Sequence, residues 1–370
     1  MALLSRIRRP LAIAVLAALA LPALLLPASP HKTVSVRENR MLARQPAWPR
    51  DLAGLRQTPR QIDAYLADHF ALRDSLVRAG QHLKREFGGQ AGPPLAVEGR
   101  DGWLFFSDGL LQSSGQVRDA AQSAGFASFV CDIHARLAKR GVRTGFALIP
   151  SPGEVYPEGL PLWAGPAQRP TDYDDILARV RTCGVEAVDL RPALIAARAH
   201  GQIYRRTDSH WTLLGAVYGY NAMLDVIGRP DWRLAIDPNA WHDRVFRTGD
   251  LPAMAGLEPR DEHALVEERF EQAPLLRTAI LGVRFANKPP FVVEGKKPGP
   301  TVLLIGDSYT EDPMAPLFLD HVGRYAWVHH DECAFDWAVI DKVKPDIVLI
   351  APVEREARCR GGRPLHLPAL

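Results

Sequence analysis

Two short segments of the sequence carry residue types that together could perform nucleophilic catalysis. The first is Gly306-Asp307-Ser308, which directly follows the apolar run Val302–Ile305. A serine that follows a buried parallel strand lies where open α/β sheets bind ligands, beyond the carboxyl ends of the strands. Gly306 permits a tight turn there, and the amide of Ser308 could face a developing oxyanion. The pattern predicts a nucleophile, although the tripeptide alone is also typical of a turn or a helix N-cap.

The second segment is Asp208-Ser209-His210, which lies well before the first in the chain. A serine hydroxyl needs a base to take its proton, and histidine titrates near neutral pH. The histidine in turn needs an acceptor that fixes its tautomer. Asp208 and His210 alternate about Ser209, so an extended segment points both side chains to one face, and Thr212 can cap the helix that follows. The spacing predicts a triad with Ser308; the alternative is a pair of capping residues beside a surface histidine.

From about Gln122 onward, short apolar runs alternate with segments of helical periodicity. These elements must position the two segments that carry Ser308, Asp208 and His210. Such runs are typical of parallel strands that helices cover on both faces. The sequence therefore predicts an α/β fold with a doubly wound parallel sheet flanked by helices. The predicted strands span residues 144–149, 185–190, 301–305, 325–329 and 346–351, and the predicted helices span 126–139, 173–182 and 334–343.

Regular structure is also predicted before this pattern begins. Residues 31 to about 60 are polar and punctuated by proline, which favours an extended lead-in. Apolar residues then recur at helical spacing over 61–87, which predicts one or two helices. Residues 97–106 are typical of a β-hairpin with Asp101-Gly102 as its turn.

The N-terminus has the layout of an export signal. Arg6, Arg8 and Arg9 precede an apolar run from Leu11 to Leu26. A charged stretch followed by an apolar one is typical of a secretory signal, and here the small residues and prolines after it leave open whether the leader is cleaved. The body of the protein is therefore expected in the periplasm, tethered to the inner membrane by the N-terminal segment.

These patterns divide the chain into four parts. Residues 1–30 are predicted as a signal peptide or membrane anchor, and 31–95 as the lead-in and helical N-terminal segment. Residues 96–365 are predicted as the catalytic domain. Within it, 228–300 is rich in proline and poorly periodic, which predicts a long insertion between two halves of the sheet, with a few irregular strands.

The composition excludes several classes of protein. Of 370 residues, 47% are hydrophobic and 24% are charged, which is ordinary globular usage. The formal net charge of +3 equals the contribution of the leader's arginines, so the rest of the chain is balanced. A nucleic-acid-binding protein would carry a basic face, so no nucleic-acid partner is expected.

The chain has four cysteines, and none are spaced as C-x-x-C, which excludes a zinc ribbon. In an exported chain an even number of cysteines favours disulfides. We favour Cys131 with Cys183 and Cys333 with Cys359, because each pair flanks neighbouring α/β units; other pairings and four buried thiols stay open. His329-His330-Asp331 lacks a third ligand at metal-like spacing, so no metal is expected.

Taken together, the motifs resemble the alginate O-acetyltransferase family of the AlgJ and AlgX type, which has an SGNH hydrolase-like domain. Gly306-Asp307-Ser308 looks like the nucleophile block of SGNH hydrolases, but here the Asp-x-His segment precedes the serine, the reverse of the usual order. That permuted order resembles the alginate family. Other matching segments are Glu38-Asn39-Arg40, Pro46–Pro49, Gly99–Phe105, Gly249-Asp250-Leu251 and Pro345–Arg355.

The resemblance implies transfer of acetyl groups to hydroxyls of an exopolysaccharide, alginate or a similar polymer, through an acetyl-serine intermediate. It implies that Ser308 is the nucleophile, His210 the base and Asp208 the residue that orients the base. No cofactor is expected. The glycine and asparagine that supply further oxyanion donors in ordinary SGNH enzymes have no convincing counterpart here. Further candidates for substrate binding are Tyr309, Trp211 and Arg355.

The resemblance also implies partners: a membrane-bound O-acyltransferase as acetyl donor, an exopolysaccharide acceptor and other polysaccharide export components. Two other functions fit the same residues. An acetyl esterase would use the same triad and pass the acetyl group to water. A non-catalytic, polysaccharide-binding scaffold would instead need exposed aromatic side chains along a groove, for which Trp211, Trp232 and Trp241 are the candidates.

Overall fold

The computed structural model describes residues 34–35, 40–43, 45–46, 48–49, 52–70, 73, 75, 95–107, 109–165, 168–247, 249–271, 275–285 and 288–359. The chain divides into two compact units, residues 1–92 and 93–370. The predicted leader, residues 1–30, lies outside the described residues, and the predicted domain assignments stay predictions. Within the described ranges, no helix combines the length and the apolar character needed to cross a membrane.

The first unit contains a short antiparallel strand pair and one long helix. Strand β1 (Val34–Ser35) pairs with β2 (Arg40–Met41), and α2 spans Leu52–His69. The prediction of an extended lead-in to about residue 60 is therefore wrong. The polar, proline-punctuated composition misled the prediction, since Pro59 lies inside α2 although a proline removes one helical hydrogen bond. Most of the helical stretch predicted beyond α2 lies outside the described residues.

A seven-stranded sheet forms the centre of the second unit, with the order β6-β5-β13-β11-β12-β10-β9. The first five strands are parallel to their neighbours, as predicted, and β10 and β9 continue the sheet antiparallel. The strands are β5 (Arg143–Leu148), β6 (Glu186–Asp189), β9 (Thr278–Ala279), β10 (Phe291–Glu294), β11 (Thr301–Gly306), β12 (Arg324–His329) and β13 (Ile347–Ala351).

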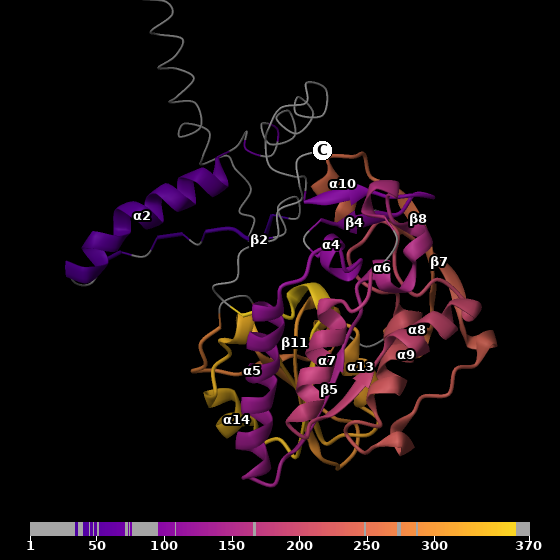
Figure 1. Ribbon diagram of the computed structural model, residues 1–370. Helices are drawn as coiled ribbons and strands as arrows, with labels where there is room; N and C mark the ends of the chain where they lie inside the picture. Colours follow the sequence, from indigo (N-terminus) through magenta and orange to yellow (C-terminus); the bar gives the residue numbers. More distant parts are fainter. Residues whose placement is uncertain are drawn as a thin grey trace, which may run out of the picture. The chain divides into compact units, whose positions relative to one another are not determined.

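Helices cover both faces of this sheet (Figure 1). Val302 and Leu304 of β11 face the core made with α8, α9 and α13, whereas Leu303 and Ile305 face the core made with α5, α7 and α14. Apolar residues at consecutive positions are what a strand buried on both faces requires. The helices are α4 (Leu110–Ser113), α5 (Ala120–Ala138), α6 (Pro152–Val155), α7 (Asp172–Thr182), α8 (Arg191–Ala197), α9 (Leu213–Met223), α10 (Leu251–Ala255), α11 (Glu268–Glu271), α12 (Ser308–Glu311), α13 (Met314–Phe318) and α14 (Ala338–Val343).

Two antiparallel pairs lie outside the central sheet. Strands β3 (Ala96–Glu98) and β4 (Leu104–Phe106) form the predicted hairpin, and Asp101 and Gly102 have φ angles of 53° and 78°. The amide of Trp103 donates to Arg100 O at 3.0 Å, and positive φ angles at both central residues of such a turn are typical of type I′, which explains the Asp-Gly sequence. Strands β7 (His242–Arg247) and β8 (Asp261–Val266) form the second pair.

The region predicted as an insertion, 228–300, is only in part separate from the sheet. It supplies the β7–β8 pair, but it also supplies β9 and β10, which extend the sheet beyond β12. The prediction missed this because a four-residue and a two-residue strand give too short a pattern to recognise.

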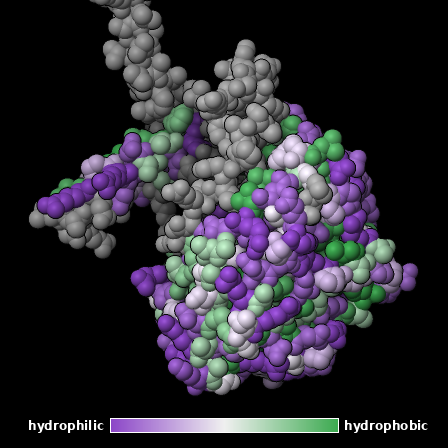
Figure 2. Space-filling view, viewed as in Figure 1, coloured by the Kyte–Doolittle hydropathy of each residue, from purple (hydrophilic) through white to green (hydrophobic). Residues whose placement is uncertain are grey.

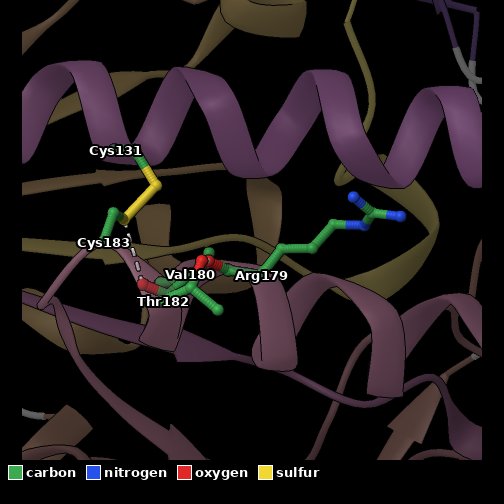
Figure 3. The surroundings of a disulfide bond; sticks show 5 residues. All are labelled: Cys131, Arg179, Val180, Thr182 and Cys183. Atoms are coloured by element: carbon green, nitrogen blue, oxygen red, sulfur yellow. Dashed lines mark hydrogen bonds between the residues drawn. A yellow bond between two sulfur atoms is a disulfide. The ribbon is translucent and has the colours of Figure 1, made fainter.

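Both favoured disulfides are present. Cys131 of α5 is joined to Cys183, which caps the C-terminus of α7 (Figure 3), and Cys333 is joined to Cys359. The first bridge links two helices that cover the same face of the sheet. The second links the turn after β12 to the segment that follows β13. Each bridge therefore fastens neighbouring α/β units together.

Candidate active site

The turn that carries Ser308 joins β11 directly to α12. Asp307 caps this helix: its Oδ1 accepts from the amide of Tyr309 at 2.9 Å, and its Oδ2 accepts from the amide of Val353 at 2.6 Å. Gly306 is required at the strand end, because a Cβ there would lie 2.1 Å from Thr310 Oγ1. The turn therefore fixes Ser308 against the end of β13, at the carboxyl edge of the sheet.

The structure brings the three predicted catalytic residues together. His210 Nε2 lies 3.0 Å from Ser308 Oγ, and His210 Nδ1 lies 2.7 Å from Asp208 Oδ1. The same Oδ1 accepts from the backbone amide of His210 at 3.0 Å. These are the contacts expected of a serine, a base and the carboxylate that orients the base. The His210 side chain is 34% exposed, so solvent and ligands can reach this site.

A rigid helix holds the loop that carries Asp208 and His210. Thr212 caps α9 by accepting from the amide of Gly215 at 3.1 Å, as predicted, and its hydroxyl donates to Gln202 O at 2.7 Å. Nearer the tip of the loop, the amide of Arg205 donates to His210 O at 3.2 Å. A side-chain and a backbone hydrogen bond therefore join the two arms of the loop.

The carboxylate of Asp208 is held in its charged form. Burial by itself would raise the pKa of Asp208, but the hydrogen bond from His210, the charge of His210 and the charge of Arg205 together lower it below its usual value. The guanidinium of Arg205 lies 3.8 Å from Asp208 Oδ2. An ionised Asp208 accepts the Nδ1 proton of His210 and leaves the Nε2 lone pair directed at Ser308.

The three residues predicted to bind substrate lie inside the protein. Tyr309 is 0% exposed, and Trp211 and Arg355 are each 5% exposed. Trp211 Nε1 donates to Tyr309 O at 3.0 Å, and Arg355 Nη1 donates to the Tyr309 hydroxyl at 3.1 Å. The hydroxyl of Tyr309 in turn donates to Ser209 O. In this arrangement all three hold the catalytic loops, and contact with a substrate stays a prediction.

The structure adds Asp250 to the site. Its Oδ1 accepts from the amide of Ser209 at 2.7 Å, and its Oδ2 accepts from the hydroxyl of Ser209 at 2.6 Å. The matching segment Gly249-Asp250-Leu251 drew attention in the sequence, but no spacing rule connects it with residues so far before it. Only the folded chain brings the two loops together.

Asp208, His210 and Asp250 each offer a ligand-type atom, and these atoms lie within 4.8 Å of one another. Each of them is already engaged by a hydrogen bond within the site, His210 Nδ1 with Asp208 and both oxygens of Asp250 with Ser209. We therefore assign the cluster to the support of His210 rather than to a metal ion.

A small, mainly apolar pocket lies next to Arg355. Its lining includes Phe106 of β4, Leu110 of α4, Ser151 and Ser209, but neither Ser308 nor His210. The pocket is therefore separate from the position where a reacting group would meet the serine.

The fold and this geometry define a class. A doubly wound sheet that carries a serine after a central parallel strand, with a histidine and an aspartate arranged around it, is the architecture of an SGNH hydrolase-like protein. A family model described as the SGNH hydrolase-like domain of the acetyltransferase AlgX matches residues 96–321. The chain belongs to this AlgX family.

Individual relatives agree with that assignment. The probable alginate O-acetylase AlgJ of Pseudomonas aeruginosa is 36% identical over 228 residues, which cover 60% of this chain and 57% of the relative. The protein of the same name from Pseudomonas putida is 30% identical over 172 residues, 45% of this chain and 44% of the relative. The chain thus spans about half the length of the curated relatives it matches.

The fold also has a counterpart among solved structures. A DHHW family protein from Eubacterium siraeum aligns over 72% of this chain and 95% of its own, with a TM-score of 0.50 and 18% sequence identity. At this identity the likeness concerns the fold alone. It agrees with the α/β architecture derived from the strand order.

Proposed function

We propose that this protein is an O-acetyltransferase that moves acetyl groups to hydroxyls of an exopolysaccharide, alginate or a similar polymer, through an acetyl-Ser308 intermediate. The observation that carries the proposal is the continuous chain of contacts from Ser308 Oγ to His210, 3.0 Å, and from His210 to Asp208, 2.7 Å. Membership of the AlgX family and the curated relatives named alginate O-acetylase support acetyl as the group and a polysaccharide as the acceptor.

The reaction has two steps. First, His210 Nε2 takes the proton of Ser308 as its oxygen attacks the acetyl carbonyl of the donor, and His210 then gives that proton to the leaving group. Second, a sugar hydroxyl loses its proton to His210 and attacks the acetyl-serine. The proton returns to Ser308 as the serine oxygen leaves. Asp208, which is ionised, stabilises the imidazolium that forms in each step.

The negative charge that develops on the acetyl oxygen needs hydrogen-bond donors. Ser308 is the first residue of α12, so its amide belongs to the end of the helix where backbone N–H groups point outward. We assign that amide the role of an oxyanion donor.

The structure contradicts the sequence argument for a non-catalytic, polysaccharide-binding scaffold. It relied on Trp211, Trp232 and Trp241 as exposed platforms for sugar rings, but these side chains are 5%, 2% and 9% exposed. Trp232 packs against Phe318 and His321, as an ordinary core residue would. The esterase alternative uses the same triad and is separated from the transferase by experiment.

We also propose that the chain works in the periplasm, tethered to the inner membrane, and receives acetyl from a membrane-bound O-acyltransferase. The predicted leader supports this location, and the two disulfides suit an oxidising compartment. Other components of polysaccharide export would present the polymer. Crosslinking of the exported chain in cells, followed by identification of the captured membrane protein, tests the donor.

The function is tested with the purified full-length chain, a chromogenic acetyl ester as donor and oligosaccharides of the candidate polymers as acceptors. Release of the chromophore reports the first step, and mass spectrometry of the sugars reports the second. We expect both activities in the wild type and neither in Ser308→Ala. The chain offers a matched control in Ser151→Ala, because Ser151 also follows a strand of the sheet but has no histidine among its hydrogen-bond partners.

Three results have different meanings. Acetylated sugar in the wild type alone supports the transferase. Acetyl that goes only to water, whatever sugar is offered, makes the protein an esterase. Equal activity of wild type and Ser308→Ala overturns the triad.

A further inference from the structure

Ser209, the residue between Asp208 and His210, is held at each of its polar groups. Its amide and hydroxyl donate to the two oxygens of Asp250, at 2.7 and 2.6 Å. Its carbonyl oxygen accepts from the Tyr309 hydroxyl and, at 3.3 Å, from Arg355 Nη1. Four hydrogen bonds thus hold a residue that has no role of its own in a serine–histidine–aspartate triad.

The loop that supplies Asp250 is packed directly against the catalytic loop. The amide of Leu251 donates to Thr207 O at 3.2 Å. At Gly249 a Cβ would lie 2.1 Å from Thr207 O and 2.5 Å from Asp208 Cβ, so only glycine permits the approach. The two loops meet backbone to backbone, and this close approach delivers the carboxylate to Ser209.

Through Ser209 the carboxylate of Asp250 also reaches the base. The hydroxyl of Ser209 lies 3.4 Å from His210 Nδ1, the atom that donates to Asp208. The imidazole therefore has one carboxylate in direct contact and a second that lies one hydroxyl away. Both carboxylates lie on the Nδ1 side of the ring, opposite the Nε2 atom that faces Ser308.

We infer that Asp250 is a positioning residue for the proposed reaction: through Ser209 it fixes the orientation of His210, and its negative charge stabilises the protonated imidazole. This inference rests on the proposed function, because it assigns His210 the role of base. In this account two carboxylates, those of Asp208 and Asp250, support the base instead of one.

Other charged or titratable groups face His210 and Asp250, and they form the background against which a substitution of Asp250 is measured. Arg205 lies 3.8 Å from both Asp208 and Glu262, and Glu262 accepts from the hydroxyl of Thr207 at 2.9 Å. On the far side, the ring of Tyr309 lies 5.2 Å from that of His210, and Arg355 lies behind it. Burial and the charge of Asp208 raise the pKa of Asp250, while His210 and the two bonds from Ser209 oppose that rise.

The test is the pH dependence of acetyl-ester hydrolysis by the full-length chain, with Asp250→Asn compared with the wild type. Displacement of a base by about 1 Å can cost about 100-fold in rate, so we expect kcat to fall by about 10- to 100-fold with KM unchanged. Loss of a negative charge near His210 favours the neutral imidazole, so the acid limb of kcat/KM should move to lower pH. A purely structural role would lower activity without moving that limb.

Two further variants sharpen the test. Ser209→Ala removes the hydroxyl between Asp250 and His210, and we expect the double variant with Asp250→Asn to be no slower than Asp250→Asn alone, because the two act as one unit. Asp243→Asn is the matched control: Asp243 also pairs with a histidine, His263, but on the exposed β7–β8 pair. We expect this control to leave both kcat and the acid limb unchanged.

The outcomes separate this inference from the proposed function. If Ser308→Ala abolishes hydrolysis while Asp250→Asn keeps wild-type kcat and acid limb, the inference is overturned and the triad stands. If Ser308→Ala remains active, the proposed function itself fails. Should Asp250→Asn not fold, Ser209→Ala decides: a drop in kcat of about 3- to 10-fold at constant KM, the scale of one lost hydrogen bond, supports the inference, and an unchanged kcat overturns it.

Discussion

Two serines lie at the carboxyl edge of the same sheet, and of the two only Ser308 contacts a histidine that could act as its base. Ser308 follows β11 and contacts His210; Ser151 follows β5, and its amide donates to Glu354 at 3.1 Å. Both lie in the part of an open α/β sheet where ligands bind. Carboxylate groups lie near both serines. The two sites differ in the basic side chains that accompany those carboxylates.

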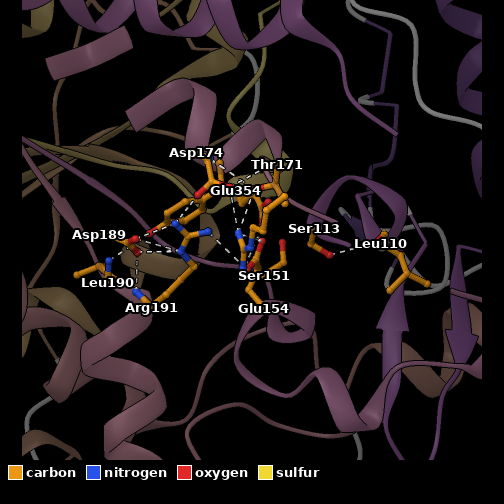
Figure 4. Close-up of polar contacts among 12 residues, drawn as sticks. Leu110, Ser113, Ser151, Glu154, Thr171, Asp174, Asp189, Leu190, Arg191 and Glu354 are labelled. Carbon is orange, nitrogen blue, oxygen red and sulfur yellow. Dashed lines mark hydrogen bonds and ion pairs between the residues drawn. The ribbon is translucent and has the colours of Figure 1, made fainter. Parts of the chain in front are cut away.

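Around Ser151 the partners of the carboxylates are arginines (Figure 4). Arg169 pairs with Glu154 and Asp174, and Arg191 bridges Asp174 at 2.6 Å and Asp189 at 2.7 Å. Arginine stays protonated at any pH of interest and cannot act as a base. The Glu154 side chain is 1% exposed, so its carboxylate is shielded from solvent. These ion pairs link α6, α7 and α8 to the end of β6.

Around Ser308 the corresponding partner is a histidine that is one-third exposed. An imidazole, unlike a guanidinium, can act as a base, and the two carboxylates lie on the side of the ring away from the serine. For the proposed function, a serine and carboxylates at a sheet edge are therefore not enough. The proposed site also needs a base with one accessible face, and only Ser308 of these two serines has one.

The largest expected effect is a loss of activity that is confined to the Ser308 site. Ser308→Ala and His210→Gln should each lower kcat for acetyl-ester hydrolysis by about 10⁴-fold or more, because members of a triad act as a unit. Ser151→Ala should leave kcat within about 2-fold of wild type, as an ordinary substitution outside the site does. Steady-state kinetics on folded, matched preparations give the answer. A comparable loss in Ser151→Ala would show that the two regions are not distinct.

The next effect concerns the orienting carboxylate. Asp208→Asn keeps the shape of the side chain but loses the charge that fixes the His210 tautomer, so kcat should fall by about 10³- to 10⁴-fold. Measurement of kcat across pH, with thermal unfolding as the check on folding, tests this. An activity within about 10-fold of wild type would mean that His210 does not depend on Asp208.

A smaller effect appears in stability rather than in rate, on the Ser151 side. Burial, followed by the charge of Glu154, raises the pKa of Glu354 to about 8 from an ordinary 4.5. The folded protein then keeps a proton that the unfolded chain releases over this range, so Glu354 makes stability fall as pH rises from about 4.5 to about 8. Glu354→Gln should flatten that dependence.

The measurement is the unfolding temperature of wild type and Glu354→Gln at the two ends of this pH range. The difference should shift in favour of the variant by at least about 1 °C as pH rises, which is the effect of about 1 kcal/mol in a chain of 370 residues. Parallel curves for the two proteins would contradict the raised pKa. Acetyl-ester hydrolysis should be the same in both, because Glu354 belongs to the structural region.

The smallest expected effect is that of a chelator. The ligand-type atoms of Asp208, His210 and Asp250 are all engaged in hydrogen bonds, and the proposed reaction needs no metal. Dialysis against EDTA should leave kcat unchanged within error. Loss of activity that added zinc or magnesium restores would replace the two-carboxylate account with a metal site.

The comparison also explains which parts of the site could be predicted from the sequence. Ser308 could be predicted because a strand end followed by Gly-Asp-Ser is a local pattern, and Asp208 with His210 because an Asp-x-His spacing places both on one face. The family resemblance joined the two segments. Even the cysteine pairs followed from their neighbouring α/β units.

The remaining features depend on tertiary packing. Asp250 reaches Ser209 only because Gly249 lets two distant loops touch, and no periodicity reports such an approach. Tyr309 and Arg355 are polar residues next to the motifs, which favours substrate contact in sequence, yet each is buried and bonded to Ser209. The short strands β9 and β10 are recognisable only from their partners in the sheet.

The central claim, that acetyl passes through Ser308, is tested most directly by trapping the intermediate. The full-length chain is mixed with a chromogenic acetyl ester, quenched in acid after the first turnover and digested, and the peptide that contains Ser308 is examined by mass spectrometry. We predict one acetyl group on Ser308 in the wild type and none in His210→Gln, with the acetyl moving to sugar when acceptor is added before the quench. Acetylated sugar formed with no acetyl on Ser308, and formed equally by Ser308→Ala, would contradict the account.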